Sequence, residues 1–359
     1  VQDGGEPPTT LFYRYAGATP GTISGMLHRA VSIGGAVTLG GVTLADGGNL
    51  TLSNVTATGG SVNDGQGSVT VSGGTYDGTG FTLANTASSI TGVTLADGTI
   101  STAGDVDSAT LDNTSLGFTG GGNVALSSST ITRTIVSVAE SVTADIGGNA
   151  FISGTLRVRG TATADIYSNT FHNCALSVSE QADVTADGNS FAGAAGITVH
   201  SNAGVDLTGN TLTVDGNAAN QPAILIEPDT APVDGAVYAL TSNVLQSKDG
   251  VSDGVKVSAK VGVSGVLDVA LTDNTIAGFD MGIYVEDYLV HNWEINVAVN
   301  GSTLTSNAYA LYPKFGGVDS SFVAQNNCIA GNREAGVRCA QTGFVVDATG
   351  NYWGHPKGP

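Results

Sequence analysis

One short stretch of the sequence combines carboxylates with aromatic side chains. Its members are Glu286, Asp287, Tyr288, His291, Trp293 and Glu294. An exposed aromatic ring can stack on a sugar ring, and carboxylates can accept hydrogen bonds from sugar hydroxyl groups. The stretch is therefore our candidate carbohydrate contact. Trp293 also begins an alternating apolar run with Ile295 and Val297, so an inward orientation of its ring is an open alternative.

Four aspartates recur four residues before an asparagine. They are Asp145, Asp165, Asp206 and Asp347, with Thr185 in the same place between them. Carboxylates at adjacent positions could share a hard cation such as Ca²⁺. A solvated polar face is the alternative that we favour. The sequence thus predicts no cofactor and no metal site, with Asp145 and Asp165 as the weak candidates and Ca²⁺ binding not expected.

Histidine and cysteine residues show neither a metal-ligand spacing nor a disulfide framework. The histidines His28, His172, His200, His291 and His355 are scattered along the chain. The three cysteines are interpreted as small apolar fillers. Cys339 is predicted to point inward and Cys328 to follow a turn, so a bond between them is not favoured.

A sequence repeat defines the elements that must position these residues. Between residues 144 and 212 it reads ADIGGNAF, ADIYSNTF, VTADGNSF and VDLTGNTL, with the asparagines 20, 20 and 21 residues apart. Apolar residues three and five positions before each asparagine alternate as in a strand, and a large apolar residue such as Phe171 follows it by two positions. Repeats of this length with short strands and turns predict the coils of a parallel β-helix.

Asparagine marks the turn of each coil. The turn asparagines are Asn149, Asn169, Asn189, Asn210, Asn243, Asn274, Asn327 and Asn351. Asparagine tolerates the left-handed backbone region, and stacked asparagines can form hydrogen-bonded ladders. In the earlier coils Asn54 and Asn113 take the turn. The inward position of Ile146 is traced back through Leu126, Leu111, Ile90, Val71 and Leu52.

Beyond Asn210 the coils lengthen by insertions at two recurrent places. The insertions are residues 215–222, 247–253, 227–235 and 286–294. Insertions on fixed edges of a solenoid build a raised flank, which is often the binding face.

Residues 1–36 do not fit the repeat. Ile23, Met26 and Leu27 recur at helical spacing after an aromatic, strand-like run. We expect residues 1–36 to cap the β-helix of residues 37–359 with a short helix or a strand. The alternative is a strand that docks on another subunit. The docking residues would be Leu11, Phe12, Tyr13 and Tyr15.

The end of the chain carries a specific resemblance. Asn351-Tyr352-Trp353-Gly354, followed by Gly358-Pro359, resembles the closing coil of right-handed parallel β-helix repeat proteins, the pectate-lyase-like group of secreted and surface proteins. The resemblance implies right-handed coiling and three parallel sheets. We therefore predict an all-β chain folded as a single right-handed parallel β-helix. The group contains polysaccharide-cleaving enzymes and non-catalytic adhesins, so it leaves function open.

The resemblance also sets what a catalytic site should contain. A lyase of this group would carry an exposed basic residue beside an acidic Ca²⁺ cluster. Arg157, Lys256 and Arg338 share one outward position, but several coils separate them, so we interpret them as separate surface cations. A hydrolase would carry close aspartates with a histidine, and no such motif is present. No catalytic residue is predicted.

Composition limits the partners. The net charge is −19 and only 12% of residues are charged. Nucleic acid and anionic membranes are poor partners for such a chain. The first residue is Val, and no apolar run approaches the length of a membrane span, so we expect an extracellular or cell-surface location.

These observations favour a secreted, non-catalytic structural or adhesive element of a cell surface or extracellular filament, self-associating head to tail. The alternative is a polysaccharide-cleaving β-helix enzyme, either a lyase or a hydrolase, or a carbohydrate-binding module.

Overall fold

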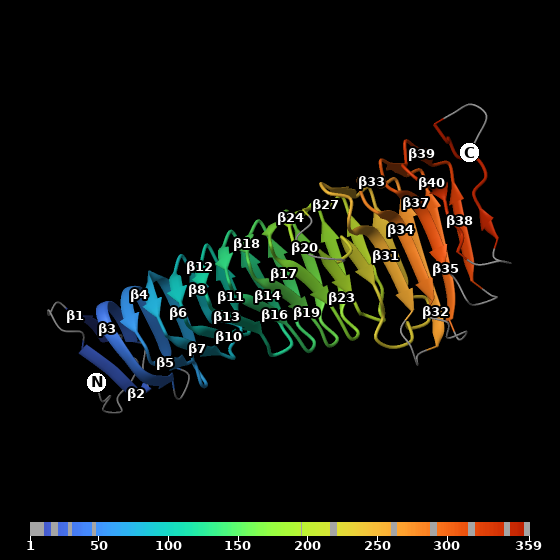
Figure 1. Cartoon of the computed structure of the whole chain (residues 1–359). Coiled ribbons are helices and arrows are strands. Elements are labelled where there is room, and N and C mark those ends of the chain that lie inside the picture. The colour runs from blue at the N-terminus through green and yellow to red at the C-terminus, as the bar shows by residue number, and fades with distance from the viewer. Residues whose placement is uncertain are drawn as a thin grey trace. The chain divides into compact units, whose positions relative to one another are not determined.

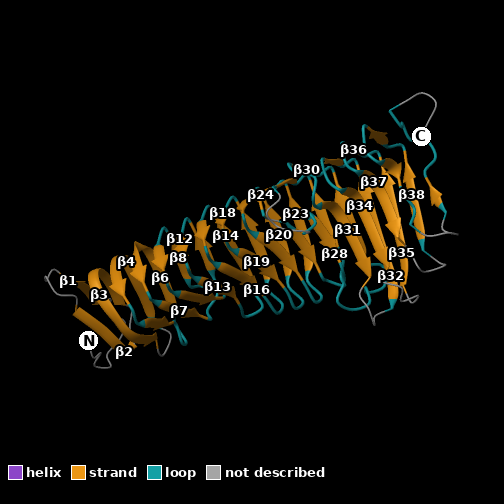
Figure 2. Ribbon diagram, in the orientation of Figure 1, coloured by secondary structure: helices purple, strands orange, loops and turns teal. Residues whose placement is uncertain are grey.

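The chain is a right-handed parallel β-helix, as predicted. The computed structural model describes residues 11–15, 21–27, 31–44, 48–194, 196–215, 221–259, 264–287, 293–314, 320–340 and 345–354. These ranges contain strands, turns and loops but no helix (Figure 2). Successive coils pair in parallel, as Ala125 with Asp145 or Thr185 with Asp206. Within the same ranges there is no helix that could cross a membrane.

The chain divides into two compact units. The first is Val1–Leu156 with Ala162–Ala164, and the second is Arg157–Thr161 with Asp165–Pro359. The division runs through β19 (Thr155–Val158) and β20 (Thr163–Tyr167). After the first coils of the chain, each coil supplies one strand to each of three rows of paired parallel strands, which we call the first, second and third sheets in chain order. Figure 1 shows the successive coils.

The first unit begins with two shorter strands, followed by three long strands that pass through more than one sheet. They are β1 (Leu11–Tyr15), β2 (Gly21–Leu27), β3 (Val31–Leu44), β4 (Asn49–Thr58) and β6 (Ser68–Asp77). Its first sheet continues with β8 (Ser89–Thr91), β11 (Asp105–Asp107), β14 (Asn123–Ser127) and β17 (Thr143–Gly147). The second continues with β9 (Thr94–Ala96), β12 (Thr110–Asp112), β15 (Thr130–Thr132) and β18 (Ala150–Ile152). The third contains β5 (Ser61–Asn63), β7 (Gly80–Leu83), β10 (Thr99–Thr102), β13 (Ser115–Phe118) and β16 (Ile135–Val138).

The second unit repeats the same order with longer loops. Its first sheet contains β23 (Asp183–Asp187), β26 (Val205–Thr208), β29 (Val237–Thr241), β32 (Gly265–Thr272), β35 (Trp293–Asn300), β38 (Ser321–Gln325) and β41 (Val346–Asp347). The second contains β21 (Thr170–His172), β24 (Ser190–Gly193), β27 (Thr211–Val214), β30 (Val244–Ser247), β33 (Thr275–Ala277), β36 (Thr303–Thr305) and β39 (Cys328–Ala330). The third contains β22 (Ala175–Val178), β25 (Ile197–Val199), β28 (Ile224–Ile226), β31 (Asp253–Ala259), β34 (Met281–Asp287), β37 (Tyr309–Lys314) and β40 (Ala335–Val337).

The N-terminal segment contributes strands rather than a helix. β1 pairs with β3 from Leu11 opposite Val31, and β2 pairs with β3 from Gly21 opposite Val37. The short helix that we considered for the segment with Ile23, Met26 and Leu27 is therefore wrong, because these residues lie in β2. Pairing with the backbone of β3 satisfies the amide groups of this segment and overrides the helical spacing of its apolar residues.

The inward column of the first sheet differs from the predicted one at one position. Ile146 pairs with Leu126, Leu126 with Val106, and Val106 with Ile90. Leu111 belongs instead to the second sheet, opposite Ile131. The prediction failed there because the step from Ile90 to Val106 is shorter than the other coils, so a count of about 20 residues loses the register.

A buried asparagine ladder follows the first sheet. In the second unit the side-chain oxygen of Asn210 accepts hydrogen bonds from the backbone amide and the Nδ2 of Asn189, both at 3.0 Å. Asn243 does the same for Asn210, at 2.9 and 3.1 Å. The bonded asparagines are 21 residues apart in the first pair and 33 residues apart in the second. The residues inserted between Asn210 and Asn243 therefore leave the ladder intact.

The left-handed residue of these turns precedes the ladder asparagine. Gly188 and Gly209 have φ values of 61° and 64°, directly before Asn189 and Asn210. Asn54 and Asn113, which we placed at the ladder turn, are exposed residues with positive φ themselves. They use the backbone tolerance of asparagine and do not occupy the buried ladder position.

The three cysteines are free thiols, and no bond joins Cys328 to Cys339. Cys174 is buried. Cys339 is exposed, so its predicted inward orientation is wrong. The strand β40 ends at Val337, two residues before Cys339, and the alternation of a strand no longer applies there.

Candidate functional site

The third sheet of the second unit brings charged and aromatic side chains together on its outer face. Lys256 of β31 lies opposite Tyr284 of β34, which lies opposite Tyr312 of β37. Two residues along the same strands, Glu286 lies opposite Lys314. Alternation within a strand places the residues of these two rows on one face.

Glu286 is the anion at the centre of this face. Its two carboxylate oxygens contact Lys314 Nζ at 2.8 Å and Lys256 Nζ at 3.2 Å. The residue is only 5% exposed. Burial alone would raise the pKa of Glu286, but hydrogen bonds from Lys314, Tyr284 and Lys256 outweigh burial and lower this pKa to about 2. Glu286 therefore holds both lysines in place as a permanent anion.

Aromatic rings connect the lysines to an arginine from the next coil. The rings of Tyr284 and Tyr312 are stacked, with centroids 5.5 Å apart. Lys256 Nζ lies 5.2 Å from the centroid of Tyr284, and Arg338 Cζ lies 5.0 Å from that of Tyr312. The guanidinium also donates a 2.6 Å hydrogen bond to the hydroxyl oxygen of Tyr309. Stacking and cation–π contacts make this surface rigid.

We call this surface the Lys-Tyr cluster. It consists of Lys256, Tyr284, Glu286, Tyr309, Tyr312, Lys314 and Arg338. It presents three cations and one anion on a chain whose net charge is −19.

Asp253 supplies a titrating carboxyl group near the cluster. It begins β31, the strand that carries Lys256. Burial raises the pKa of Asp253 to about 6; the charge of Lys256 opposes this shift, while Asp280 and Glu286 add to it. A carboxyl group with such a pKa can take up or release a proton near neutral pH.

The structure divides the predicted carbohydrate contact between two sheets. Glu286 and Asp287 end β34 of the third sheet, and Glu294 lies on β35 of the first sheet. Trp293 is 3% exposed, so its predicted role as an exposed stacking aromatic is wrong and the inward alternative holds. Asp287 is 3% exposed and points to the inner face. Tyr288 and His291 lie outside the described residues.

The interpretation of the basic residues as separate surface cations is also wrong for Lys256 and Arg338. Tyr284 and Tyr312 bridge the coils between them. The sequence did contain a pattern that predicts this contact. Tyrosine takes the position of Lys256 in two later coils, as Tyr284 in Gly282-Ile283-Tyr284-Val285 and as Tyr312 in Ala310-Leu311-Tyr312-Pro313.

The aspartate column does not form a continuous carboxylate row in the second unit. Asp206 lies between Thr185 and Ala239 on adjacent strands. Asp165 and Asp206 are both exposed. Asp145 is exposed in the first unit. Among the described residues, no three His, Cys, Asp or Glu side chains are grouped so that they could hold a metal ion.

No protein-family model and no curated protein matches the chain. Among solved structures, the chain resembles a double mutant of the periplasmic alginate epimerase AlgG, with 10% identity and a TM-score of 0.35 over 94% of this chain and 79% of that one. It also resembles the A-module of the mannuronan C-5 epimerase AlgE4 of Azotobacter vinelandii, with 12% identity and a TM-score of 0.21 over 97% and 90% of the two chains. Similarity at this level concerns the fold alone.

These comparisons correct the leading interpretation of the sequence. Both neighbours are polysaccharide-modifying enzymes by name, so the non-catalytic structural or adhesive role that we expected is withdrawn, and the carbohydrate-directed alternative is taken up below as a proposal. The expectation of a structural role came from the absence of a local catalytic motif. The Lys-Tyr cluster joins side chains from separate coils, and a search for local motifs does not detect such a group.

Proposed function

We propose that the chain is a carbohydrate-active protein that binds an acidic polysaccharide on the Lys-Tyr cluster and modifies it there. The observation that carries this proposal is the row of Lys256, Tyr284, Tyr312 and Arg338 across successive coils. Tyr284 is only 8% exposed, between Lys256 and Tyr312, so the surface offers a sugar mainly its cations and the partly exposed Tyr309 and Tyr312. Sugar carboxylates pair with lysine and arginine. Adjacent coils are about 4.8 Å apart, so successive sugars of one chain can meet successive coils.

The chemistry that this site supports is removal of a proton from the carbon next to a sugar carboxylate. Lys314 or Arg338 would neutralise the carboxylate, which makes that carbon more acidic. Asp253 would accept the proton, because its raised pKa makes it a stronger base than an ordinary aspartate. Such a step begins both elimination, which cleaves the chain, and epimerisation, which inverts the carbon.

The test uses polygalacturonate and alginate as probes, with and without Ca²⁺. Binding is measured by affinity electrophoresis, cleavage by new chain ends, and epimerisation by incorporation of solvent deuterium. We expect binding to weaken at least about tenfold in Arg338→Gln. We expect turnover to fall about 100-fold or more in Asp253→Asn, with binding retained. The matched control is Arg133→Gln, an exposed arginine of the first unit paired with Asp112.

Each outcome decides a separate part of the proposal. Binding without any turnover would leave a carbohydrate-binding module and refute the catalytic role of Asp253. Equal binding by the wild type and Arg338→Gln would refute the Lys-Tyr cluster as the binding surface.

A polysaccharide target favours a location outside the cytoplasm, and we include this location in the proposal. Fractionation of the source cells with an antibody against the chain tests it. Recovery of the protein in the cytoplasmic fraction would contradict it.

Self-association through the N-terminal segment stays a separate proposal. Among the described strands, β1 pairs with β3 alone, which leaves its other backbone edge for a strand of a second copy. Sedimentation of the intact chain beside a version without residues 1–16 tests this contact. A concentration-independent monomer would refute it.

A further inference from the structure

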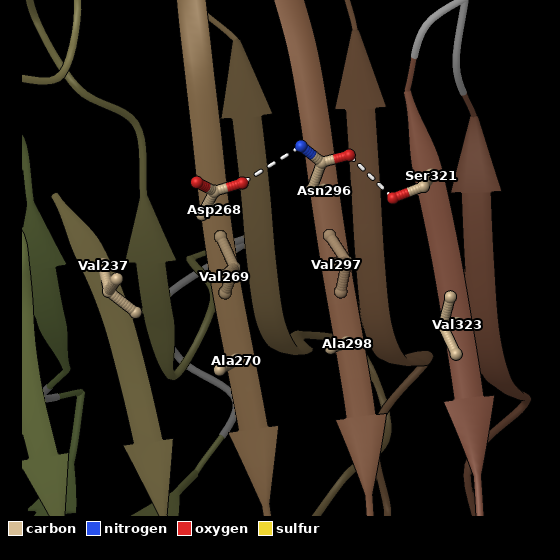
Figure 3. A pocket seen from close by; sticks show the side chains of 9 residues that line it. All are labelled: Val237, Asp268, Val269, Ala270, Asn296, Val297, Ala298, Ser321 and Val323. Carbon is tan, nitrogen blue, oxygen red and sulfur yellow. Dashed lines mark hydrogen bonds between the residues drawn. The ribbon is translucent and has the colours of Figure 1, made fainter. Parts of the chain in front are cut away.

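A shallow groove lies on the outer face of the first sheet in the second unit, away from the sheet that carries the Lys-Tyr cluster. Strands β29, β32, β35 and β38 form it, and its volume is about 190 Å³ (Figure 3). Its lining is mostly apolar, with polar side chains along one edge.

Small side chains form the floor of the groove. Ala270 lies opposite Ala298, and Ala298 lies opposite Val323, so three adjacent coils expose short side chains at one level. Val237, which lies opposite Asp268 and also lines the groove, is 50% exposed. A concave, mostly apolar surface with a few polar groups at its edge is the usual form of a small binding site.

The polar edge is a hydrogen-bonded row of three residues in register. Asn296 Nδ2 donates to Asp268 Oδ1 and to Glu294 Oε1, both at 3.0 Å. Ser321 Oγ donates to Asn296 Oδ1 at 2.6 Å (Figure 3). These bonds use both amide protons of Asn296 and the hydroxyl proton of Ser321. The row therefore offers an occupant hydrogen-bond acceptors rather than donors.

The charge of the groove further restricts the class of ligand that it can bind. The four strands carry no lysine or arginine, while Asp268 and Glu294 are acidic. Carboxylates, sulfates and phosphates accept hydrogen bonds and are anionic, so this edge repels them. A second copy docking by the same face would bring like charges together. The acceptors require a partner rich in donors, and the apolar floor requires a partner with apolar faces.

We propose that this groove binds a neutral polysaccharide, as a second carbohydrate site separate from the Lys-Tyr cluster. Hydroxyl groups of the sugars donate to Asp268, Glu294 and Ser321, and the C–H faces of the rings pack on Ala270, Ala298 and Val323. The spacing of the coils, about 4.8 Å, places successive sugars over successive strands.

The test measures retention of the intact chain by hydroxyethyl cellulose, galactomannan and xyloglucan in affinity electrophoresis. Polygalacturonate and chitosan are the anionic and cationic comparisons. Ala298→Gln places a longer side chain over the groove floor. Its matched control is Ala125→Gln, at the equivalent position of the first sheet in the first unit. We expect Ala298→Gln to weaken binding of a neutral probe at least about tenfold and Ala125→Gln to leave it unchanged.

Three results would overturn the inference: no neutral probe is retained, Ala298→Gln behaves as Ala125→Gln does, or chitosan is the only probe bound. Circular dichroism melts of both variants show whether a loss of binding reflects unfolding. Lys256→Gln separates the two sites, because it should weaken binding of polygalacturonate and leave neutral binding unchanged. The experiment can therefore refute neutral binding at the groove while it supports acidic binding at the Lys-Tyr cluster, or the reverse.

Discussion

Asp253 couples the stability of the fold to pH. Its pKa is raised from 3.8 to about 6 in the folded state, so folding favours the protonated carboxyl group. The resulting stability is fully present below about pH 4 and is lost as the pH rises through about 6. The loss amounts to roughly 2 to 3 kcal/mol at neutral pH.

We expect Asp253→Asn to remove this pH dependence. The variant should gain stability relative to the wild type between pH 4 and 7, while losing the proposed turnover. Urea unfolding of both proteins across this range measures the difference. A constant difference in free energy of unfolding across the range would contradict the assignment.

Glu286 has the opposite pH dependence. Because hydrogen bonds from Lys314, Tyr284 and Lys256 lower its pKa to about 2, its stabilising contribution is present above about pH 4.5 and is lost as the pH falls toward 2. Glu286→Gln should lower the free energy of unfolding by about 1 to 3 kcal/mol at pH 7. This loss is smaller than for a fully buried ion pair, because both lysines are partly exposed.

The same unfolding measurement at pH 2.5 and pH 7 tests Glu286→Gln. The difference from the wild type should shrink at the lower pH. A difference of equal size at both values would show that lost packing, rather than lost charge, destabilises the variant.

Phe171 reports on the packing of the inward column. It is 1% exposed, and its ring stacks on Phe191 with centroids 4.4 Å apart. Phe171→Ala should therefore lower the free energy of unfolding by about 3 to 5 kcal/mol. Chemical denaturation measures this cost, with Tyr167→Ala, an exposed position on the preceding strand, as the control. A cost below about 1 kcal/mol would mean that the cavity collapses without loss.

At the scale of an element, the asparagine ladder holds the turns after the first sheet. Asn210 is fully buried, and its Nδ2 donates to Ala186 O at 2.8 Å and to Asn243 Oδ1 at 3.1 Å. Asn210→Ala removes both Nδ2 hydrogen bonds and leaves the buried backbone amide of Asn189 without its acceptor, so we expect a loss of about 2 to 4 kcal/mol. Asn113→Gly, at an exposed residue with φ of 49°, should be close to neutral.

Thermal melting of the two variants checks the ladder prediction. Equal melting temperatures would show that water replaces the lost hydrogen bonds at Asn210. The comparison separates a buried turn asparagine from an exposed one, whose side chain donates a hydrogen bond to the exposed Asp97.

At the scale of the whole molecule, we expect stability to be independent of Ca²⁺. The exposed Asp206 lies between Thr185 and Ala239 in adjacent coils, and the exposed Asp145 lies opposite Ala125. A solvated face of this kind gains little from a divalent ion. Melting temperatures in EDTA and in millimolar Ca²⁺ should agree, and a rise of several degrees with Ca²⁺ would establish a metal site.

The coil architecture could be predicted from the sequence because its determinants are local. Each coil repeats an alternating strand, a turn with a buried asparagine and a large apolar residue such as Phe151 or Phe171, and these patterns can be read one coil at a time. The register failed at Leu111, where one shortened coil interrupts the count, and the helical spacing near Ile23 was overridden by pairing with β3.

The amino-acid sequence by itself therefore determined that the chain coils, which residues point inward and where the turns fall. Only the tertiary structure decided which outward residues meet. Lys256, Glu286 and Lys314 are about 30 residues apart in the sequence, and they contact because coil length sets the register between strands. Inserted loops change that length from coil to coil, so no local pattern predicts the contact. Trp293 differs from these residues, because its local alternation with Ile295 and Val297 already allowed the inward orientation that the structure shows.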